Sequence, residues 1–139
     1  MSEGEVTTIP SKYGVSLTID RLSSIAKSKG LLVFARIDHG KGATDEGLPL
    51  RPTEVLIFGH PKVGTPLMQD RQIAGLDLPL RALAWQDEAG RVWLSYYSGS
   101  MIAARHDLTV VSRAAVEAMD KGIVMLCTLA AGGNVLPTH

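Results

Sequence analysis

Cysteine is nearly absent from this sequence of 139 residues, which contains Cys127 alone. A single thiol excludes an intramolecular disulfide framework and a cysteine-based zinc site, because both need at least two sulfur atoms. Cys127 follows Leu126 in an apolar stretch, and burial in such surroundings raises the pKa of a thiol and lowers its reactivity. We therefore expect no catalytic cysteine.

Net charge and long apolar runs are missing as well. Fourteen basic residues balance fourteen acidic ones, which removes the electrostatic footprint that nucleic acids or anionic membranes require. The apolar stretch 122–131 falls well short of the ~20 residues of a membrane-spanning helix, and the first ten residues do not have the pattern of a secretory signal. The sequence thus predicts a cytoplasmic protein that binds neither nucleic acid nor membrane.

The length fits one compact domain, which we place at residues 1–131, followed by a flexible tail at 132–139. Apolar runs of strand length predict five strands, at 6–10, 31–38, 54–60, 80–87 and 91–97. Helical spacing predicts helices at 16–29, 65–71, 101–105 and 112–131. Strands that follow one another without a helix favour an α+β fold, a two-layer antiparallel sheet with helices packed on one face.

Capping residues set the expected helix ends. Ser16 is placed to cap the first helix and Gly30 lies just beyond its end, while Thr65 and Pro66 are suited to begin the second. The glycine-rich and proline-rich segment 39–52 is expected to be a connection with room for one helical turn near 43–46. One apolar stripe follows the last helix: Val116, Met119, Ile123, Leu126 and Ala130.

The segments 80–87 and 91–97 alternate around a four-residue, glycine-ended link, as a hairpin does. Their inward faces are expected to carry the side chains of Leu80, Ala82, Ala84, Val92, Leu94 and Tyr96. Tyr96 and Tyr97 point to opposite faces, and the sequence leaves open which of them fills the core. Leu83, Trp85 and Trp93 make the opposite face apolar too, and such surplus apolar area predicts a homodimer.

Five linked motifs carry a family resemblance. They are Ile37-Asp38-His39, Leu50-Arg51-Pro52-Thr53-Glu54, Phe58-Gly59-His60-Pro61-Lys62, Gly64-Thr65-Pro66-Leu67-Met68 and Leu76-Asp77-Leu78-Pro79-Leu80. In this order they resemble domain-of-unknown-function family 302, over residues 6–108. The resemblance implies a β-α-β-β-β-β core with a C-terminal helix, and homodimers, but no agreed activity. The family more often has asparagine where this chain has His60, so the resemblance assigns that histidine no role.

The most concentrated polar residues follow the strand at 31–38. If that strand pairs antiparallel with 54–60, Asp38 and His39 lie near Glu54, and Arg51 can supply positive charge. These four residues are the ligand-binding candidates, because a carboxylate beside an imidazole can orient it as a base. The alternative interpretation is structural, with Asp38 capping a turn and His39 a polar strand-end residue.

His60 lies at the far end of the same strand pair, so a metal site shared with His39 within one subunit is disfavoured, while a site shared between two subunits stays open. We expect no metal or cofactor. Lys62 and Thr65 form a candidate anion site at a helix start, beside the alternative of an ordinary capped helix.

Asp77 is expected to accept hydrogen bonds from backbone amides or to form an ion pair with Arg51 or Arg81. His106 and His139 are both expected to be solvated.

These observations predict a non-catalytic homodimeric module that binds a small molecule or a protein. The alternative is a metal-dependent or acid–base enzyme that uses Asp38, His39 and Glu54 on a small anionic substrate. The sequence leaves the reaction, the catalytic role of each of these residues, the ligand and the biological process open.

Overall fold

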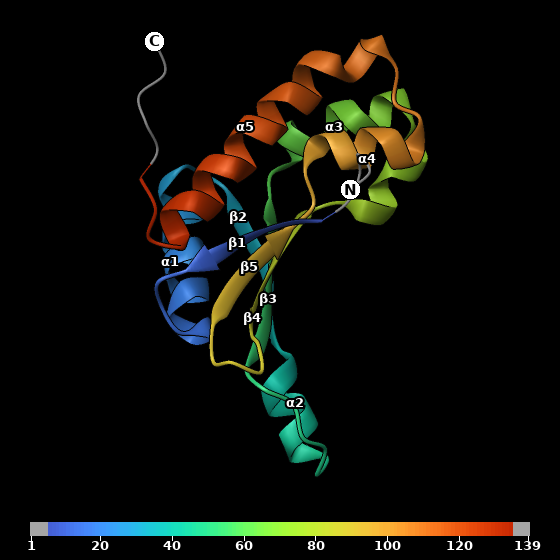
Figure 1. Ribbon diagram of the computed structural model, residues 1–139. Helices are drawn as coiled ribbons and strands as arrows, with labels where there is room; N and C mark the ends of the chain where they lie inside the picture. Colours follow the sequence, from blue (N-terminus) through green and yellow to red (C-terminus); the bar gives the residue numbers. More distant parts are fainter. Residues whose placement is uncertain (1–5, 135–139) are drawn as a thin grey trace.

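The computed structural model describes residues 6–134 and arranges them as one five-stranded antiparallel sheet with helices (Figure 1). The strands are β1 (Thr7–Ser11), β2 (Leu32–Asp38), β3 (Thr53–Gly59), β4 (Leu80–Gln86) and β5 (Val92–Tyr96). The α-helices are α1 (Val15–Ser28), α2 (His39–Asp45), α3 (Pro61–Asp70), α4 (Gly99–His106) and α5 (Arg113–Ala130). Two 3-10 helices are η1 (Gln72–Asp77) and η2 (Val110–Ser112). The predicted α+β class is confirmed.

The strands lie in the order β1-β5-β4-β3-β2, and all neighbours are antiparallel. The predicted hairpin joins β4 to β5, and its turn ends at Gly90, whose φ of +84° suits a residue without a Cβ. The first strand of the sequence pairs with the last one at one edge of the sheet, so that Ile9 lies opposite Leu94. Strands from distant parts of the sequence thereby lie side by side in a single layer.

One face of the sheet is covered. The inward side chains of β3 and β4, among them Leu56, Phe58 and Ala82, are buried against α1, which contributes Ile19 and Leu22 to the same core. Helix α5 packs against α1, and α3 and α4 lie at one end of the layer (Figure 1). This arrangement follows from the two periodicities, since every second strand residue and every third or fourth helix residue is apolar.

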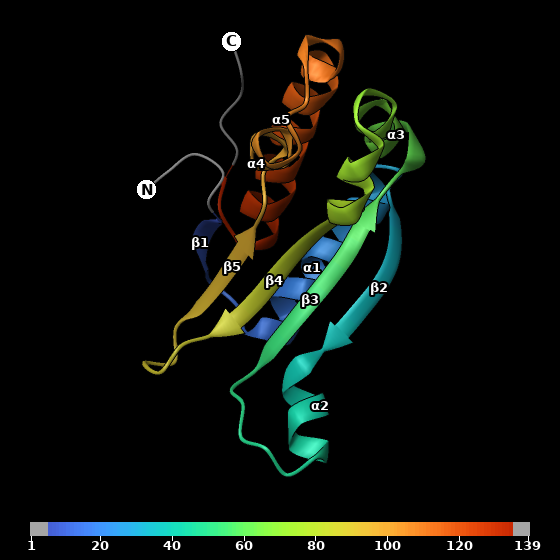
Figure 2. The same ribbon diagram turned by 90° about the vertical axis from the view of Figure 1, so that its right-hand side faces the viewer.

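The other face is uncovered, and Figure 2 looks onto it with α1 behind the strands. It carries Ile57, Leu83, Trp85 and Trp93 in the outward positions. The two tryptophan rings lie across the hairpin with centroids 6.4 Å apart. Tyr96 points the other way and is only 4% exposed, which answers the question of which tyrosine fills the core. The apolar surplus predicted from the sequence therefore lies on this open face.

Two helix starts differ from the prediction. Helix α1 begins at Val15 after Gly14, so Ser16 does not cap it; the side-chain and backbone oxygens of Ser16 accept hydrogen bonds from Arg36 instead. The expected connection after β2 begins with a full helix, α2, because Asp38 at the strand end accepts the N–H of Lys41 and starts it at once. Gly30 does end α1, with a φ of +81°.

The later helices follow the predicted pattern more closely. Helix α4 is longer than the expected 101–105, because the hydroxyl of Ser98 accepts the N–H of Met101 and moves its start forward. All five members of the stripe predicted for α5 are buried. Cys127 is buried with them, and burial raises the pKa of its thiol, as expected.

Within residues 6–134, the helices are all too short or too polar to cross a bilayer. The end of α5 lies beside the end of β1, where the N–H of Lys12 donates to the carbonyl of Ala131 at 2.9 Å. The predicted flexible tail at 132–139 lies outside the described residues from residue 135 onward.

Candidate functional site

The site predicted at the end of β2 forms in part. Strands β2 and β3 pair as expected, with Asp38 directly opposite Glu54. Both side chains point to the covered face, because paired residues in an antiparallel ladder share a face. Glu54 is 7% exposed, which makes it one of very few buried ionisable groups among the described residues.

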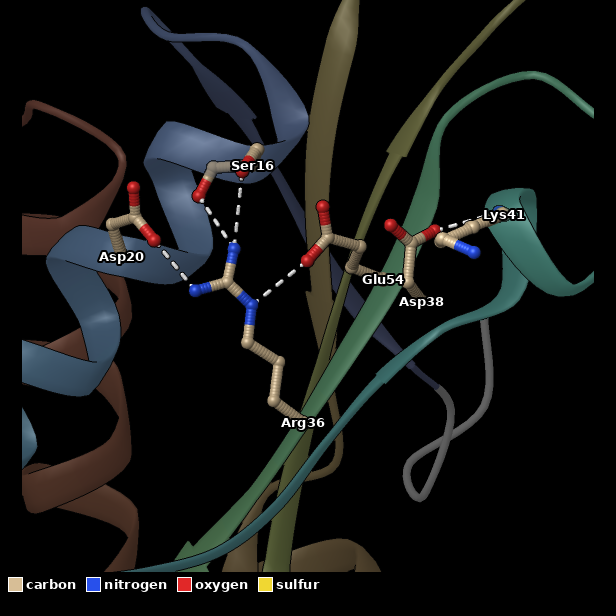
Figure 3. Close-up of polar contacts among 6 residues, drawn as sticks. All are labelled: Ser16, Asp20, Arg36, Asp38, Lys41 and Glu54. Atoms are coloured by element: carbon tan, nitrogen blue, oxygen red, sulfur yellow. Dashed lines mark hydrogen bonds and ion pairs between the residues drawn. The ribbon is translucent and has the colours of Figure 1, made fainter.

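Arg36 neutralises this buried carboxylate (Figure 3). Its Nε donates to Oε1 of Glu54 at 2.8 Å, and its Nη1 donates to Oδ1 of Asp20 on α1 at 2.5 Å. Its Nη2 donates to the hydroxyl and to the carbonyl oxygen of Ser16, both at 3.1 Å. Burial disfavours the charge of Arg36, but the bonds to Asp20 and Glu54 outweigh burial and raise the pKa of the guanidinium. The cluster thus ties β2 and β3 to α1.

A cavity of about 490 Å³ opens beside this cluster, between the first turn of α1, α2 and the start of β3. Asp38, Glu54 and Lys41 line it. Oδ1 of Asp38 already accepts the N–H of Lys41 at 2.8 Å, and the ammonium group of Lys41 pairs with Asp45 at 2.9 Å. Glu54 is already paired with Arg36, and the ammonium group of Lys41, the one cation among the described lining residues, is engaged with Asp45, so the cavity offers no unengaged positive charge to an anionic substrate. The described residues contain no group of three or more metal-ligating side chains.

His39 and Arg51 do not join this cavity. His39 lines a groove on the uncovered face, because the strand turns into α2 between Asp38 and His39 and sends their side chains to opposite sides. Nε of Arg51 donates to the carbonyl of Gln86 at 3.0 Å, which fastens the loop before β3 to the end of β4. The structure therefore brings together two of the four candidates, Asp38 and Glu54.

The helix start on which the anion site at Lys62 and Thr65 was predicted is wrong. Helix α3 begins at Pro61 rather than Pro66, because proline suits the first helical position and Nδ1 of His60 accepts the N–H of Lys62 at 3.1 Å. Thr65 consequently lies within the second turn, where the amides that follow it are not free helix-start donors. The side chain of Lys62 instead lines a groove beside α5.

Sequence reasoning missed a second polar cluster around Asp77. The predicted partners Arg51 and Arg81 are wrong: Asp77 binds Nη1 of Arg105 at 3.1 Å and Nε2 of His106 at 2.7 Å. The side chain of His106 is 8% exposed, so the expectation that it is solvated is wrong as well. The one sequence signal was the position of two basic residues at the end of a helix, where cations interact favourably with the helix dipole.

Replacing Asp77 with asparagine should lower the free energy of unfolding at pH 7 by about 1–2 kcal/mol, because charge-assisted bonds to two partners are lost. Burial raises the pKa of Asp77, but His106 and Arg105 outweigh burial and lower it. A lowered folded-state pKa gives stability that is complete above the unfolded pKa of ~4 and is lost as pH falls through the folded value.

The difference in the free energy of unfolding between the unaltered chain and Asp77→Asn should therefore shrink below about pH 4. Urea unfolding of both proteins at pH 7 and at pH 3.5 measures this difference. Asp45→Asn, which breaks an exposed pair with Lys41 on α2, is the matched control and should cost about 0.3–0.5 kcal/mol. An equal cost for both variants at pH 7 would contradict the role assigned to Asp77.

The fold and its sequence resemble known proteins. The family model described as "Domain of unknown function DUF302" matches residues 7–126. The crystal structure of an uncharacterized conserved DUF302 protein from Bacillus stearothermophilus superposes with a TM-score of 0.71 at 18% identity, over 91% of this chain and 94% of that one. This likeness shows the shared fold.

Curated relatives carry a functional name. Proteins of Brucella suis biovar 1 (strain 1330) and Brucella abortus biovar 1 (strain 9-941), each named "Fluoride-specific ion channel FluC 1", are 48% identical to this chain over 127 residues. The match covers 91% of this chain but 50% and 47% of the respective relatives. The chain therefore spans about half the length of the curated relatives it matches.

These names correct the function expected from the sequence. A non-catalytic module for a small ligand or protein, with a small-substrate enzyme as its alternative, is contradicted by relatives that are named as ion channels. The sequence contained no sign of a link to ion channels, because the residues that align with the relatives form an α+β domain and, where described, include no helix that could cross a bilayer. The recognised motifs, in contrast, are confirmed: the chain belongs to the DUF302 family.

Proposed function

We propose that this chain acts as an accessory domain in fluoride transport, beside an ion-conducting part that lies in the other half of the relatives. The observation that carries this proposal is the 48% identity over 127 residues to proteins named fluoride-specific ion channels, of which the match covers about half. Two halves of one chain meet at an effective concentration in the millimolar range, so even a weak contact between them is populated. An accessory domain can therefore act through a modest surface.

The uncovered sheet face is the contact surface that we assign to this role. A groove of about 350 Å³ on it is lined by Ile37, Val55, Ile57 and Leu83. Ile37 is 42% exposed, which is unusual for a strand residue inside an apolar row. Arg81 lines the same groove and adds a fixed positive charge beside the apolar row. Such a mixture of apolar area and one guanidinium is typical of the centre of a protein interface.

The test uses the intact Brucella suis relative in a bacterium without a fluoride channel of its own. Removing the half that aligns with this chain should lower the fluoride concentration that halves growth, by about fivefold or more if the coupling is of ordinary strength. Supplying this chain together with the shortened relative should restore much of that tolerance. A shortened relative that protects cells as well as the intact one would contradict the proposal.

A surface variant locates the contact. Ile37→Lys places a charge in the groove of the uncovered face, so this variant should fail to restore fluoride tolerance. The control is Val111→Lys, at an apolar residue that is 79% exposed and lies away from the sheet in η2. Failure of both variants, or of neither, would argue against this face as the contact.

Two sequence-based expectations stay predictions. Self-association as a homodimer would use the same apolar face, because the surplus described above lies there. A cytoplasmic compartment also stays a prediction for this chain.

A further inference from the structure

A second groove lies on the helical side of the molecule and has a different character. Helix α5 passes α3 and the end of α1, and the groove between them has a volume of about 300 Å³. Its walls are apolar and include Leu31, Val63, Met119 and Ile123. This volume lies at the lower end of the range of small-molecule sites, which is about 300–1,000 Å³.

The charge at this groove has one sign. The described residues that line it include Lys29, after the end of α1, and Lys62, in the first turn of α3, but no aspartate or glutamate. Both lysines are exposed. Lysines cover apolar surface with their stems while the ammonium groups stay in water, so they place positive charge at the rim of an apolar site. An occupant that fits is apolar along its length and negative at one end.

The groove also continues toward a second apolar cavity. That cavity, of about 220 Å³, shares Gly59, Val63, Leu80 and Met119 with the groove as lining residues. An unbranched chain longer than the groove itself therefore has apolar surface to follow. At Gly122 on α5, an added Cβ would meet nothing within 4 Å, which leaves room along the helix.

We propose that this groove binds a medium-chain carboxylate, with the alkyl chain along α5 and the carboxylate between Lys29 and Lys62. Burial of the chain provides affinity, and the two ammonium groups select a negative head over a neutral or positive one. The inference goes beyond the accessory role in fluoride transport and does not depend on it, since the two use different faces of the fold.

Calorimetric titration of the full chain with sodium decanoate, below its micelle concentration at pH 7.5, tests the proposal. One decanoate should bind per chain, and affinity should rise about three- to fourfold for each methylene added from octanoate to decanoate. Decanol should bind more weakly, and decyltrimethylammonium more weakly still. Absence of binding, or equal binding of the cationic amphiphile, would overturn the proposal.

Variants separate the two parts of the site. The double variant Lys29→Gln with Lys62→Gln should weaken decanoate about five- to tenfold and leave decanol unchanged. Gly122→Leu should fill the groove and abolish binding of both. Its matched control is Gly42→Leu in α2, where an added Cβ also meets open space but lies away from the groove, and there binding should persist.

Far-UV circular dichroism checks that each variant is folded. Two other occupants would overturn the proposal. The groove would be a contact between copies if Gly122→Leu lowered the mass in solution while no variant bound decanoate. It would face a lipid surface if the chain bound anionic phosphatidylglycerol vesicles but not soluble decanoate.

Discussion

Replacing Phe58 with alanine is expected to lower the free energy of unfolding by about 3–5 kcal/mol. Phe58 is fully buried on the covered face of β3, which lies between β2 and β4. Removing its ring leaves a cavity that the surrounding strands and α1 cannot fill, because packed interiors relax only in part. No larger loss is expected from any other substitution considered above.

Phe34 is the matched control for this prediction. It is the other of the two phenylalanines, and it also lies in an apolar strand, but it is 53% exposed. Its position coincides with a register shift between Val33 and Ala35, which takes Phe34 out of the alternation of β2. Phe34→Ala should therefore change stability by no more than about 0.5 kcal/mol. Urea unfolding at pH 7 compares the two, and equal losses would contradict the burial pattern described above.

Replacing Glu54 with alanine is the second prediction with a large effect, an expected loss of about 2–3 kcal/mol. Breaking a buried ion pair from one side commonly costs about 3–5 kcal/mol, because the remaining charge is left without its partner. The side chain of Arg36 is 34% exposed and keeps its bonds to Asp20 and Ser16, so solvent and these partners reduce the loss.

The compensating double variant distinguishes a structural role for this pair from a simple loss of packing. Arg36→Met with Glu54→Leu removes both charges and keeps similar volume, so it should recover most of the stability that Glu54→Ala loses. Asp20→Asn, whose side chain is 56% exposed, should cost no more than about 1 kcal/mol. Urea unfolding of the unaltered chain, Arg36→Met, Glu54→Leu and the double variant forms a double-mutant cycle. If the double variant were less stable than either single variant, mutual neutralisation of the two charges would not account for the effect of the pair on the free energy of unfolding.

The charged groups of this cluster bind one another, and this bears on the functional assignment. Arg36 donates hydrogen bonds to Glu54, Asp20 and Ser16, and Asp38 caps the N-terminus of α2. Groups that are hydrogen-bonded in this way hold strands and helices together rather than bind a substrate. For this reason the contact that we propose for an accessory role in fluoride transport lies on the opposite, uncovered face.

The strand pairing near this site was predictable from local signals. The apolar runs that became β2 and β3 are separated by glycines and prolines, and their antiparallel pairing places Asp38 beside Glu54 as expected. Arg36 was not predicted as the partner of Glu54. Its reach to α1 depends on how the helix crosses the sheet, and spacing along the chain does not encode that crossing.

At Asp77, too, local sequence signals identified the motif, and tertiary packing decided the partners. The proline-containing motif around it was recognised, yet its partners Arg105 and His106 lie 28 and 29 residues further along the chain. The end of α4 meets η1 through the packing of both against the rest of the core, so no local pattern connects them. The predicted start of α3 is wrong for a different reason. Two prolines, Pro61 and Pro66, both suit a first helical turn, and the cap from His60 selects the earlier one.

The sequence by itself determined the order of the five strands and of the α-helices other than α2, the antiparallel α+β class, the family, the inward residues of the hairpin and the buried stripe of α5. These features depend on periodicity, turn residues and motifs, which act over a few positions. The tertiary structure alone decided which phenylalanine is buried, which residues neutralise Glu54 and Asp77, and where lysines meet an apolar groove. Those outcomes depend on contacts between distant segments, because burial and charge pairing are properties of the packed chain rather than of any short stretch of it.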